Sequence, residues 1–279
     1  MNGDPLKTHA QNIKAVTFDL WETLLFEKDG ASVKRTTARC RNLGQTLNRF
    51  GVQVSVAQVK NALDKTISSL LEKWDKNEDV THENQIQLIF KNLKRESTIL
   101  KREWISALSA AYVSPIFEVP PYLNPDARTT LKWLRNRNTL ISLICNTGLT
   151  PGTALRRFLS EQEISDYFDS MIFSDELGVR KPDCRIFNLA AEKMKVKACE
   201  VVHIGDNLKA DVWGAKNAGF NAIHLSSDAG RDKIAEADPT SLVSISRNLG
   251  NLKREHLKPD KTVTSLAMAR EAIREIETM

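Results

Sequence analysis

A short apolar run that ends abruptly in a carboxylate constrains the fold of this chain more than any other feature. The stretch of residues 14–25 begins with an apolar run that is followed at once by Asp19 and, four residues later, by the hydroxyl of Thr23. The pattern predicts a buried strand with Asp19 at its carboxyl end, which is where open parallel α/β sheets bind ligands. A lone Asp after a strand usually only caps a turn, so the interpretation of Asp19 depends on the rest of the chain.

Strands and helices are predicted to alternate through the second half of the chain. The apolar patterns indicate strands over 139–148, 167–174, 200–206 and 221–225, and helices over 127–135, 151–159, 186–194 and 210–218. This alternation is typical of a doubly wound parallel sheet, in which the polar strand ends meet along one edge. We therefore predict an α/β, Rossmann-like core. His203 lies inside one of the strands, and we expect it to have a structural role.

A long helical insertion is predicted between the first strand and the rest of the core. Residues 28–121 carry few strand signals, and their apolar residues recur at helical spacing, as in Leu43 and Leu47. We interpret this segment as a helical cap in which Trp74 and Trp104 pack between helices. Arg39 and Arg41 fit either a contact with an anionic substrate or an exposed helix face, and the exposed face is favoured.

The predicted domains are a core of residues 12–27 and 122–250, the cap of residues 28–121, and a C-terminal segment of residues 251–279. Within the core, a short helix and a strand are expected over 228–250. The C-terminal segment is expected to be a charged linker followed by an amphipathic helix over 262–279, which would dock on the core.

Composition excludes several other classes of protein. The chain has 279 residues, 41% hydrophobic and 27% charged, which is typical of a globular protein with a substantial core. Its formal charge of +5 is scattered among acids, so we expect no nucleic-acid partner. The four cysteines lie far apart and predict neither a zinc site nor disulfides. No secretory signal or membrane-spanning run is evident, and a soluble cytoplasmic protein is expected.

Four strand-end stretches together resemble the four motifs of the haloacid dehalogenase superfamily. They are Asp19–Thr23, Cys145–Gly148, Arg180–Pro182 and Gly205–Asp211. Each stretch is weak evidence alone, but their order, spacing and position at strand ends match the superfamily from about Val16 to Leu249.

The resemblance implies roles for the residues of these motifs. Asp19 would be a nucleophile that takes a phosphoryl group to form an aspartyl-phosphate, and Lys181 would supply a fixed positive charge. Asp19, Asp206 and the backbone carbonyl of Trp21 would bind Mg²⁺, with Asp211 nearby or holding Lys181. We expect the phosphoryl oxygens to be contacted by Thr23 and Asn146, with Thr147 as a further hydroxyl and Cys145 at the edge of the site.

Two motif positions depart from the superfamily pattern. Phosphatases of the superfamily usually have a second Asp at the position of Trp21, which protonates the leaving group, and an indole cannot do so. Glu22, where Gly is common, is the nearest possible substitute, although it is expected to face solvent or a turn. Cys145 replaces a Ser or Thr, and a thiol is a weak hydrogen-bond donor.

The departures leave three functions open. A Mg²⁺-dependent phosphatase acting on a small phosphomonoester is favoured, with slow turnover and a preference for good leaving groups such as aryl or acyl phosphates. A 2-haloacid dehalogenase is the first alternative, because that branch places an aromatic residue at the position of Trp21. Asp206 argues against it, since dehalogenases of this type tend to lack an acid there. A non-catalytic protein that binds a phosphorylated ligand or a protein partner is the second alternative.

Overall fold

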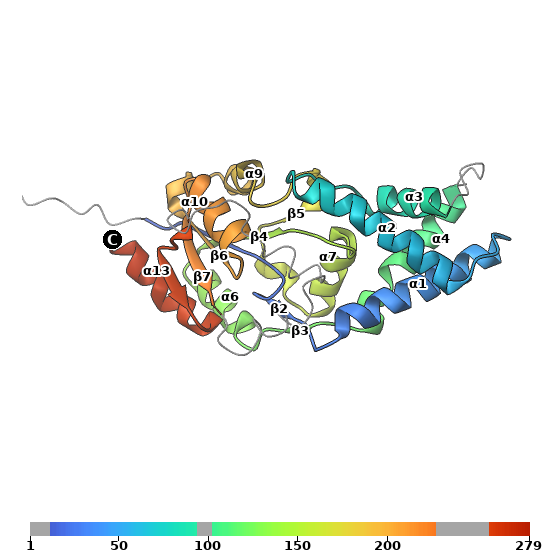
Figure 1. Cartoon of the computed structure of the whole chain (residues 1–279). Helices are drawn as coiled ribbons and strands as arrows, with labels where there is room; N and C mark the ends of the chain where they lie inside the picture. The colour runs from blue at the N-terminus through green and yellow to red at the C-terminus, as the bar shows by residue number, and fades with distance from the viewer. Residues whose placement is uncertain (1–11, 94–101, 227–256) are drawn as a thin grey trace, which may run out of the picture.

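The core of the protein is a six-stranded parallel sheet (Figure 1). The computed structural model describes residues 12–93, 102–226 and 257–279. The strand order is β5-β4-β1-β6-β7-β8, and neighbouring strands are parallel throughout. The strands are β1 (Ala15–Phe18), β4 (Leu140–Cys145), β5 (Ser170–Phe173), β6 (Val201–Gly205), β7 (Asn221–Leu225) and β8 (Lys261–Val263). The predicted α/β fold with a parallel sheet is confirmed.

The central strand β1 lies at the point where the strand order reverses. The chain adds β4 and β5 on one side of β1, and then β6, β7 and β8 on the other. Phe18 pairs with Leu143 of β4 and with Ile204 of β6, so the next residue, Asp19, leaves the sheet between the ends of both strands. Ligand sites of doubly wound sheets form at such a switch point.

Helices cover both faces of the sheet, which explains why the strands are apolar on both sides. The helices α6 (Ala127–Asn136), α7 (Gly152–Glu161) and α13 (Ala269–Glu277) share one hydrophobic cluster with the sheet. The helices α9 (Cys184–Met194) and α10 (Gly214–Asn217) share a second cluster with it. Side chains of β1 alternate between the two clusters, with Val16 and Phe18 in the first and Ala15 in the second.

The helical insertion has a hydrophobic core of its own. It contains α1 (Ala31–Arg49), α2 (Val56–Trp74), α3 (His82–Asn92), α4 (Arg102–Val113) and the short α5 (Pro115–Glu118). The apolar faces of α1 to α4 share a cluster to which the rest of the chain contributes only Leu149 among the described residues, whereas Phe117 of α5 packs against the core cluster. The chain enters through β2 (Leu25–Phe26) and returns through β3 (Tyr122–Leu123), and these two strands pair antiparallel. The insertion therefore lies to one side of the sheet (Figure 1).

The C-terminal segment differs from its prediction. A helix was expected over 262–279, but Lys261–Val263 forms β8, and α13 begins only at Ala269. A segment of three residues is too short to show a helical or a strand period. Its conformation follows from pairing with β7, in which the buried Val263 lies beside Leu225. The helix α13 packs on the core as expected. The helix and strand predicted over 228–250 lie outside the described residues.

Within the described part of the chain, no helix combines the length and the apolar character that crossing a membrane requires.

The packing of α13 on the core can be tested by a substitution that creates a cavity beneath this helix. Ile273 is 1% exposed in the cluster beneath this helix, so Ile273→Ala should lower the free energy of unfolding by about 2–5 kcal/mol. Glu271→Ala, on the exposed side of α13, should change it by less than about 1 kcal/mol. Urea denaturation measures both, and equal effects of the two variants would show that α13 does not pack as described.

Candidate active site

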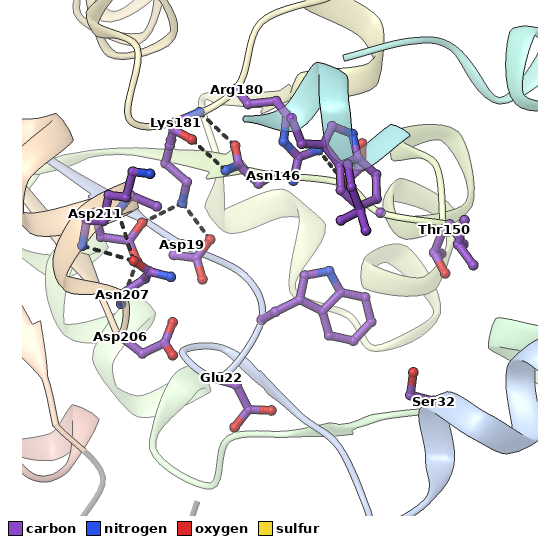
Figure 2. Close-up of a pocket in the computed structure, with 18 of the residues that line it drawn as sticks. Asp19, Glu22, Ser32, Asn146, Thr150, Arg180, Lys181, Asp206, Asn207 and Asp211 are labelled. Atoms are coloured by element: carbon purple, nitrogen blue, oxygen red, sulfur yellow. Dashed lines mark hydrogen bonds and ion pairs between the residues drawn. The ribbon is translucent and has the colours of Figure 1, made fainter. Parts of the chain in front are cut away.

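Three charged side chains meet at the carboxyl end of β1. Asp19 follows β1, Lys181 lies in the loop before α9, and Asp211 lies in the π-helical turn η3 (Leu208–Trp213) after β6. Lys181 Nζ donates hydrogen bonds to Asp19 Oδ1 at 2.6 Å and to Asp211 Oδ1 at 2.7 Å (Figure 2). The side chain of Lys181 is 1% exposed. The sequence placed these residues in three separate motifs, and the fold brings their charged atoms into contact.

Burial and mutual attraction fix the charges of this group. Burial alone would lower the pKa of Lys181, but Asp19 and Asp211 raise it above its ordinary value. Burial alone would raise the pKa of Asp211, but Lys181 and His203 hold it well below its ordinary value. Lys181 is therefore a permanent cation and Asp211 a permanent anion at neutral pH.

His203 of β6 contacts the same carboxylate oxygen of Asp211 as Lys181 does. Its Nε2 lies 3.1 Å from Asp211 Oδ1, and its Nδ1 lies 2.8 Å from Thr17 Oγ1 of β1. Burial lowers the pKa of His203, so the ring is neutral. Because the ionised Asp211 can only accept, Nε2 donates to Asp211 and Nδ1 accepts from Thr17. The structural role predicted for His203 therefore includes holding Asp211 in the site.

The loop after β6 leaves room for Asp211 by means of a glycine. The N–H of Asn207 donates to Asp211 Oδ2 at 2.9 Å, and the Asn207 side chain accepts from the N–H groups of Lys209 and Ala210. A Cβ atom on Gly205 would overlap the carboxyl group of Asp211. Gly205 therefore permits the close approach of Asp211 to the end of β6.

A third carboxylate, Asp206, completes an acidic cluster that fits a divalent cation. Carboxylate oxygens of Asp19, Asp206 and Asp211 lie within 4.8 Å of one another. Burial raises the pKa of Asp19 to about 8; Lys181 opposes this rise, and Asp211 and Asp206 add to it. With this pKa, Asp19 is largely protonated at neutral pH when no metal ion is bound, and a divalent cation beside it would favour the ionised form. The carboxyl oxygens of these side chains are the kind of donor that Mg²⁺ prefers.

The four predicted substrate contacts occupy different places. Asn146 and Thr147 line the cavity above Asp19, whereas Thr23 and Cys145 are fully enclosed and do not. Cys145 is the last residue of β4 and points into the hydrophobic cluster, and burial raises the pKa of its thiol well above the ordinary value. Thr23 Oγ1 has no hydrogen-bond partner among the described residues. Neither Thr23 nor Cys145 reaches the cavity in the arrangement observed.

Asn146 contacts Lys181 through the backbone. Asn146 Nδ2 donates to the Lys181 carbonyl oxygen at 2.9 Å, and Asn146 Oδ1 accepts from the Lys181 N–H at 2.8 Å (Figure 2). The amide was expected to contact a phosphoryl oxygen, but its carbonyl oxygen and one of its N–H groups hold the loop of residues 178–183 that carries Lys181, here called the lysine loop. No local sequence pattern indicates this pairing, because 35 residues separate the partners.

The cavity lies between the strand ends and the helical insertion. It has a volume of about 350 Å³ and reaches from Asp19 to residues of α1 and α2, including Arg35 and Trp74. Trp21 lines it, with the guanidinium carbon of Arg35 5.6 Å from its ring centre. Glu22 also lines it and has a φ of 57°, a left-handed conformation that glycine adopts more readily.

The two candidate arginines of α1 have different surroundings. Arg41 is exposed as expected and pairs with Glu118 Oε2 at 2.6 Å. Arg39 was expected to be exposed but is buried, because its guanidinium donates to the carbonyl oxygens of Tyr112 and Leu149. Trp74 was interpreted as a packing residue, but it also lines the cavity. The guanidinium carbon of Arg180 lies over its indole ring, 4.4 Å from the ring centre.

The family of the protein follows from comparison with known proteins. The model of the haloacid dehalogenase-like hydrolases matches residues 13–219 of this chain. The chain belongs to this family. A second, HAD-hydrolase-like model matches residues 178–269, and the predicted membership is confirmed.

Relatives within the HAD-like hydrolases include named phosphatases. A glyceraldehyde 3-phosphate phosphatase of Pyrococcus furiosus is 28% identical over 217 residues, which cover 76% of this chain and 80% of that protein. A phosphoglycolate phosphatase of Pseudomonas fluorescens is 31% identical over 126 residues, which cover 45% of each.

Two solved structures share the fold of this HAD-like hydrolase. A 2-haloacid dehalogenase from Pseudomonas syringae pv. tomato has a TM-score of 0.64 at 22% identity, covering 94% of this chain and 99% of that one. A HAD phosphatase from Thermococcus onnurineus has a TM-score of 0.58 at 23% identity, covering 94% and 98%.

The crowding at Gly205 generates a testable expectation. Gly205→Ala should lower the free energy of unfolding by about 1–3 kcal/mol, because the new methyl group must displace Asp211 from Lys181. Gly148→Ala is the matched control, since nothing lies within 4 Å of a Cβ atom built there. If chemical denaturation finds the two variants equally stable, Asp211 does not approach Gly205 as described.

Proposed function

We propose that this HAD-like hydrolase is a Mg²⁺-dependent phosphatase that acts on a small phosphomonoester through an aspartyl-phosphate at Asp19. The observation that carries the proposal is the carboxyl group of Asp19, which is held 2.6 Å from the buried Lys181 ammonium and lines the cavity. The phosphatase names of the relatives from Pyrococcus furiosus and Pseudomonas fluorescens support it.

Asp19 is the proposed nucleophile. Its Oδ1 accepts from Lys181, so its second oxygen is the one available to attack phosphorus. Attack forms the bond between this oxygen and phosphorus while the bond from phosphorus to the leaving oxygen breaks. Water then attacks phosphorus, releases inorganic phosphate and restores the Asp19 carboxylate. Splitting the displacement in this way requires a nucleophile of fixed orientation, which the hydrogen bond from Lys181 provides.

Lys181 and Asp211 are proposed to work as a unit. A phosphomonoester dianion and a carboxylate repel each other, and the Lys181 ammonium offsets this repulsion at the Asp19 end of the cavity. Asp211 holds the ammonium of Lys181, and the side-chain amide of Asn146 holds the Lys181 backbone. Because Lys181 is enclosed, little water screens its charge.

Asp19, Asp206 and the backbone carbonyl of Trp21 are the proposed ligands of Mg²⁺. When bound, the ion supplies positive charge to the phosphoryl oxygens and offsets the repulsion among the carboxylates. Asp211 is less suited as a direct ligand, since Lys181, His203 and the N–H of Asn207 already use its oxygens.

Trp21 is proposed to restrict the substrate to good leaving groups. It lines the cavity where superfamily phosphatases have an acid, and its indole cannot protonate a leaving alkoxide. Aryl and acyl phosphates need little protonation and should react faster than sugar phosphates.

The helical insertion is proposed to act as the cap that covers this substrate, since α1 and α2 supply the opposite wall.

The first test is hydrolysis of an aryl phosphate by the purified protein. Activity should require Mg²⁺, disappear with EDTA and return when Mg²⁺ is added. Asp19→Asn should lower kcat by more than about 10³-fold while leaving the fold intact, as monitored by circular dichroism. Activity that persists in Asp19→Asn would contradict the proposal. Absence of activity together with chloride release from 2-haloacids would identify a dehalogenase instead.

The second test restores the acid that Trp21 replaces. Trp21→Asp should raise kcat/KM for an alkyl phosphate by about 10²-fold or more, which is the usual contribution of a general acid, with a much smaller change for an aryl phosphate. Trp21→Asn, of equal size but not acidic, is the matched control. Equal gains in both variants would show that space and not protonation limits the reaction. A large loss in Glu22→Gln would show instead that Glu22 already acts as the acid.

A further inference from the structure

The loop between α2 and α3 of the helical insertion is hydrogen-bonded to the segment that carries Lys181. The N–H of Asp79 donates to the carbonyl oxygen of Gly178 at 3.1 Å, and the N–H of Arg180 donates to the carbonyl oxygen of Asn77 at 2.9 Å. Between these bonds, Glu78 and Val179 form an antiparallel bridge. The insertion therefore touches the core through backbone pairing one residue before Lys181.

The Asp79 side chain is buried at this junction and saturated with donors. Asp79 Oδ2 accepts from Arg180 Nη1 and from Ser174 Oγ, each at 2.5 Å, and Oδ1 accepts from Trp74 Nε1 at 3.0 Å. Its side chain is 0% exposed, and that of Arg180 is 9% exposed. Asp79 could not be predicted as a site residue from the sequence, because an acid in a loop between helices has no distinctive pattern.

Arg180 connects Asp79 to both loops that hold the catalytic lysine. Its Nη1 donates to the carbonyl oxygen of Thr147 as well as to Asp79. Thr147 follows Asn146, whose amide makes two hydrogen bonds to the backbone of Lys181. Ser174 adds a second link, since it donates to Asp79 and accepts from the N–H of Thr147. Through Arg180 and Ser174, one carboxylate of the insertion thus restrains the segment that precedes Lys181 and the loop after β4.

A buried ion pair of this kind is not the simplest way to stabilise the protein. Removing both charges from water costs free energy, and apolar side chains of similar volume often stabilise equally well. The pair does fix geometry, because a planar guanidinium directs its donors at defined angles. We propose that Asp79 is a positioning residue that holds Arg180, and through it the backbone of Lys181 and Asn146, in the arrangement required at Asp19. The catalytic consequence rests on the phosphatase function proposed above.

The test compares Asp79→Asn with Asp64→Asn. Asp64 lies on the exposed surface of α2 and pairs only with Lys60 among the described contacts, so the control makes the same chemical change in the same insertion. For aryl phosphate hydrolysis, Asp79→Asn should lower kcat at least about tenfold, with KM changed less than about threefold, per folded protein. Asp64→Asn should match the wild type in both constants.

Hydrogen exchange supplies a readout that needs neither substrate nor metal. The amide of Lys181 donates to Asn146, so exchange in a peptide covering 176–184 reports whether the lysine loop is held. Asp79→Asn should speed this exchange at least about fivefold at a temperature where the protein is folded, and Asp64→Asn should not. If the wild type hydrolyses no phosphoester, the proposed function fails, and the exchange result alone decides whether Asp79 positions the loop.

A double variant covers the case in which Asp79→Asn does not fold. Asp79→Leu together with Arg180→Met removes both buried charges and leaves no unpaired ion. This variant should fold, as judged by circular dichroism and its melting temperature, and should still show the faster exchange and the lower kcat. Wild-type exchange in the folded variants, or faster exchange with unchanged kcat in an active enzyme, would overturn the proposal.

Discussion

The site depends on one buried cation that is shared by two carboxylates. Lys181 has almost no contact with solvent, and a lone ammonium in that position would carry a large desolvation cost. Asp19 and Asp211 would repel each other if the ammonium were removed. Each charge is therefore stable only in the presence of the others. Several neighbouring features serve this one interaction: Gly205 gives Asp211 space, His203 orients it, and Asn146 holds the lysine loop.

The need to hold Lys181 in place also bears on the contacts between the helical insertion and the core. The insertion has its own hydrophobic cluster, and it contacts the core at the wall of the cavity, at Leu149 and at the loop between α2 and α3. A separately packed body can supply different cavity walls without disturbing the strand ends beneath it. In this protein the insertion brings Arg35 and Trp74 to the cavity and Asp79 to the lysine loop. Substrate choice and the placement of Lys181 would then both involve the insertion.

The sequence was sufficient to predict the fold and the residues that meet at the strand ends. A strand ending in Asp19 and another ending in Gly205-Asp206 carry strong local patterns, and parallel pairing forces their ends together. The sequence was insufficient wherever the position of a side chain depends on the direction in which it points or on a partner distant in the chain. Arg39 lies on a helix whose pattern suits an exposed arginine, yet it turns inward to two carbonyl oxygens. Thr23 and Asn146 lie in loops at the strand ends and Cys145 ends β4, as expected, but only three-dimensional packing determines which of their atoms face the cavity. The strand β8 was mistaken for helix because three residues carry no distinguishable period.

The most direct measurement is chemical trapping of the group transferred to Asp19. The protein would be mixed with aryl phosphate and Mg²⁺, quenched in acid during turnover, and treated with borohydride, which reduces an acyl phosphate to an alcohol. Peptide mass spectrometry should then find homoserine in place of aspartate at position 19, dependent on substrate and absent when the quench precedes substrate. Turnover without any change at Asp19, or with the modification on another residue, would contradict the central claim that this carboxylate is the nucleophile.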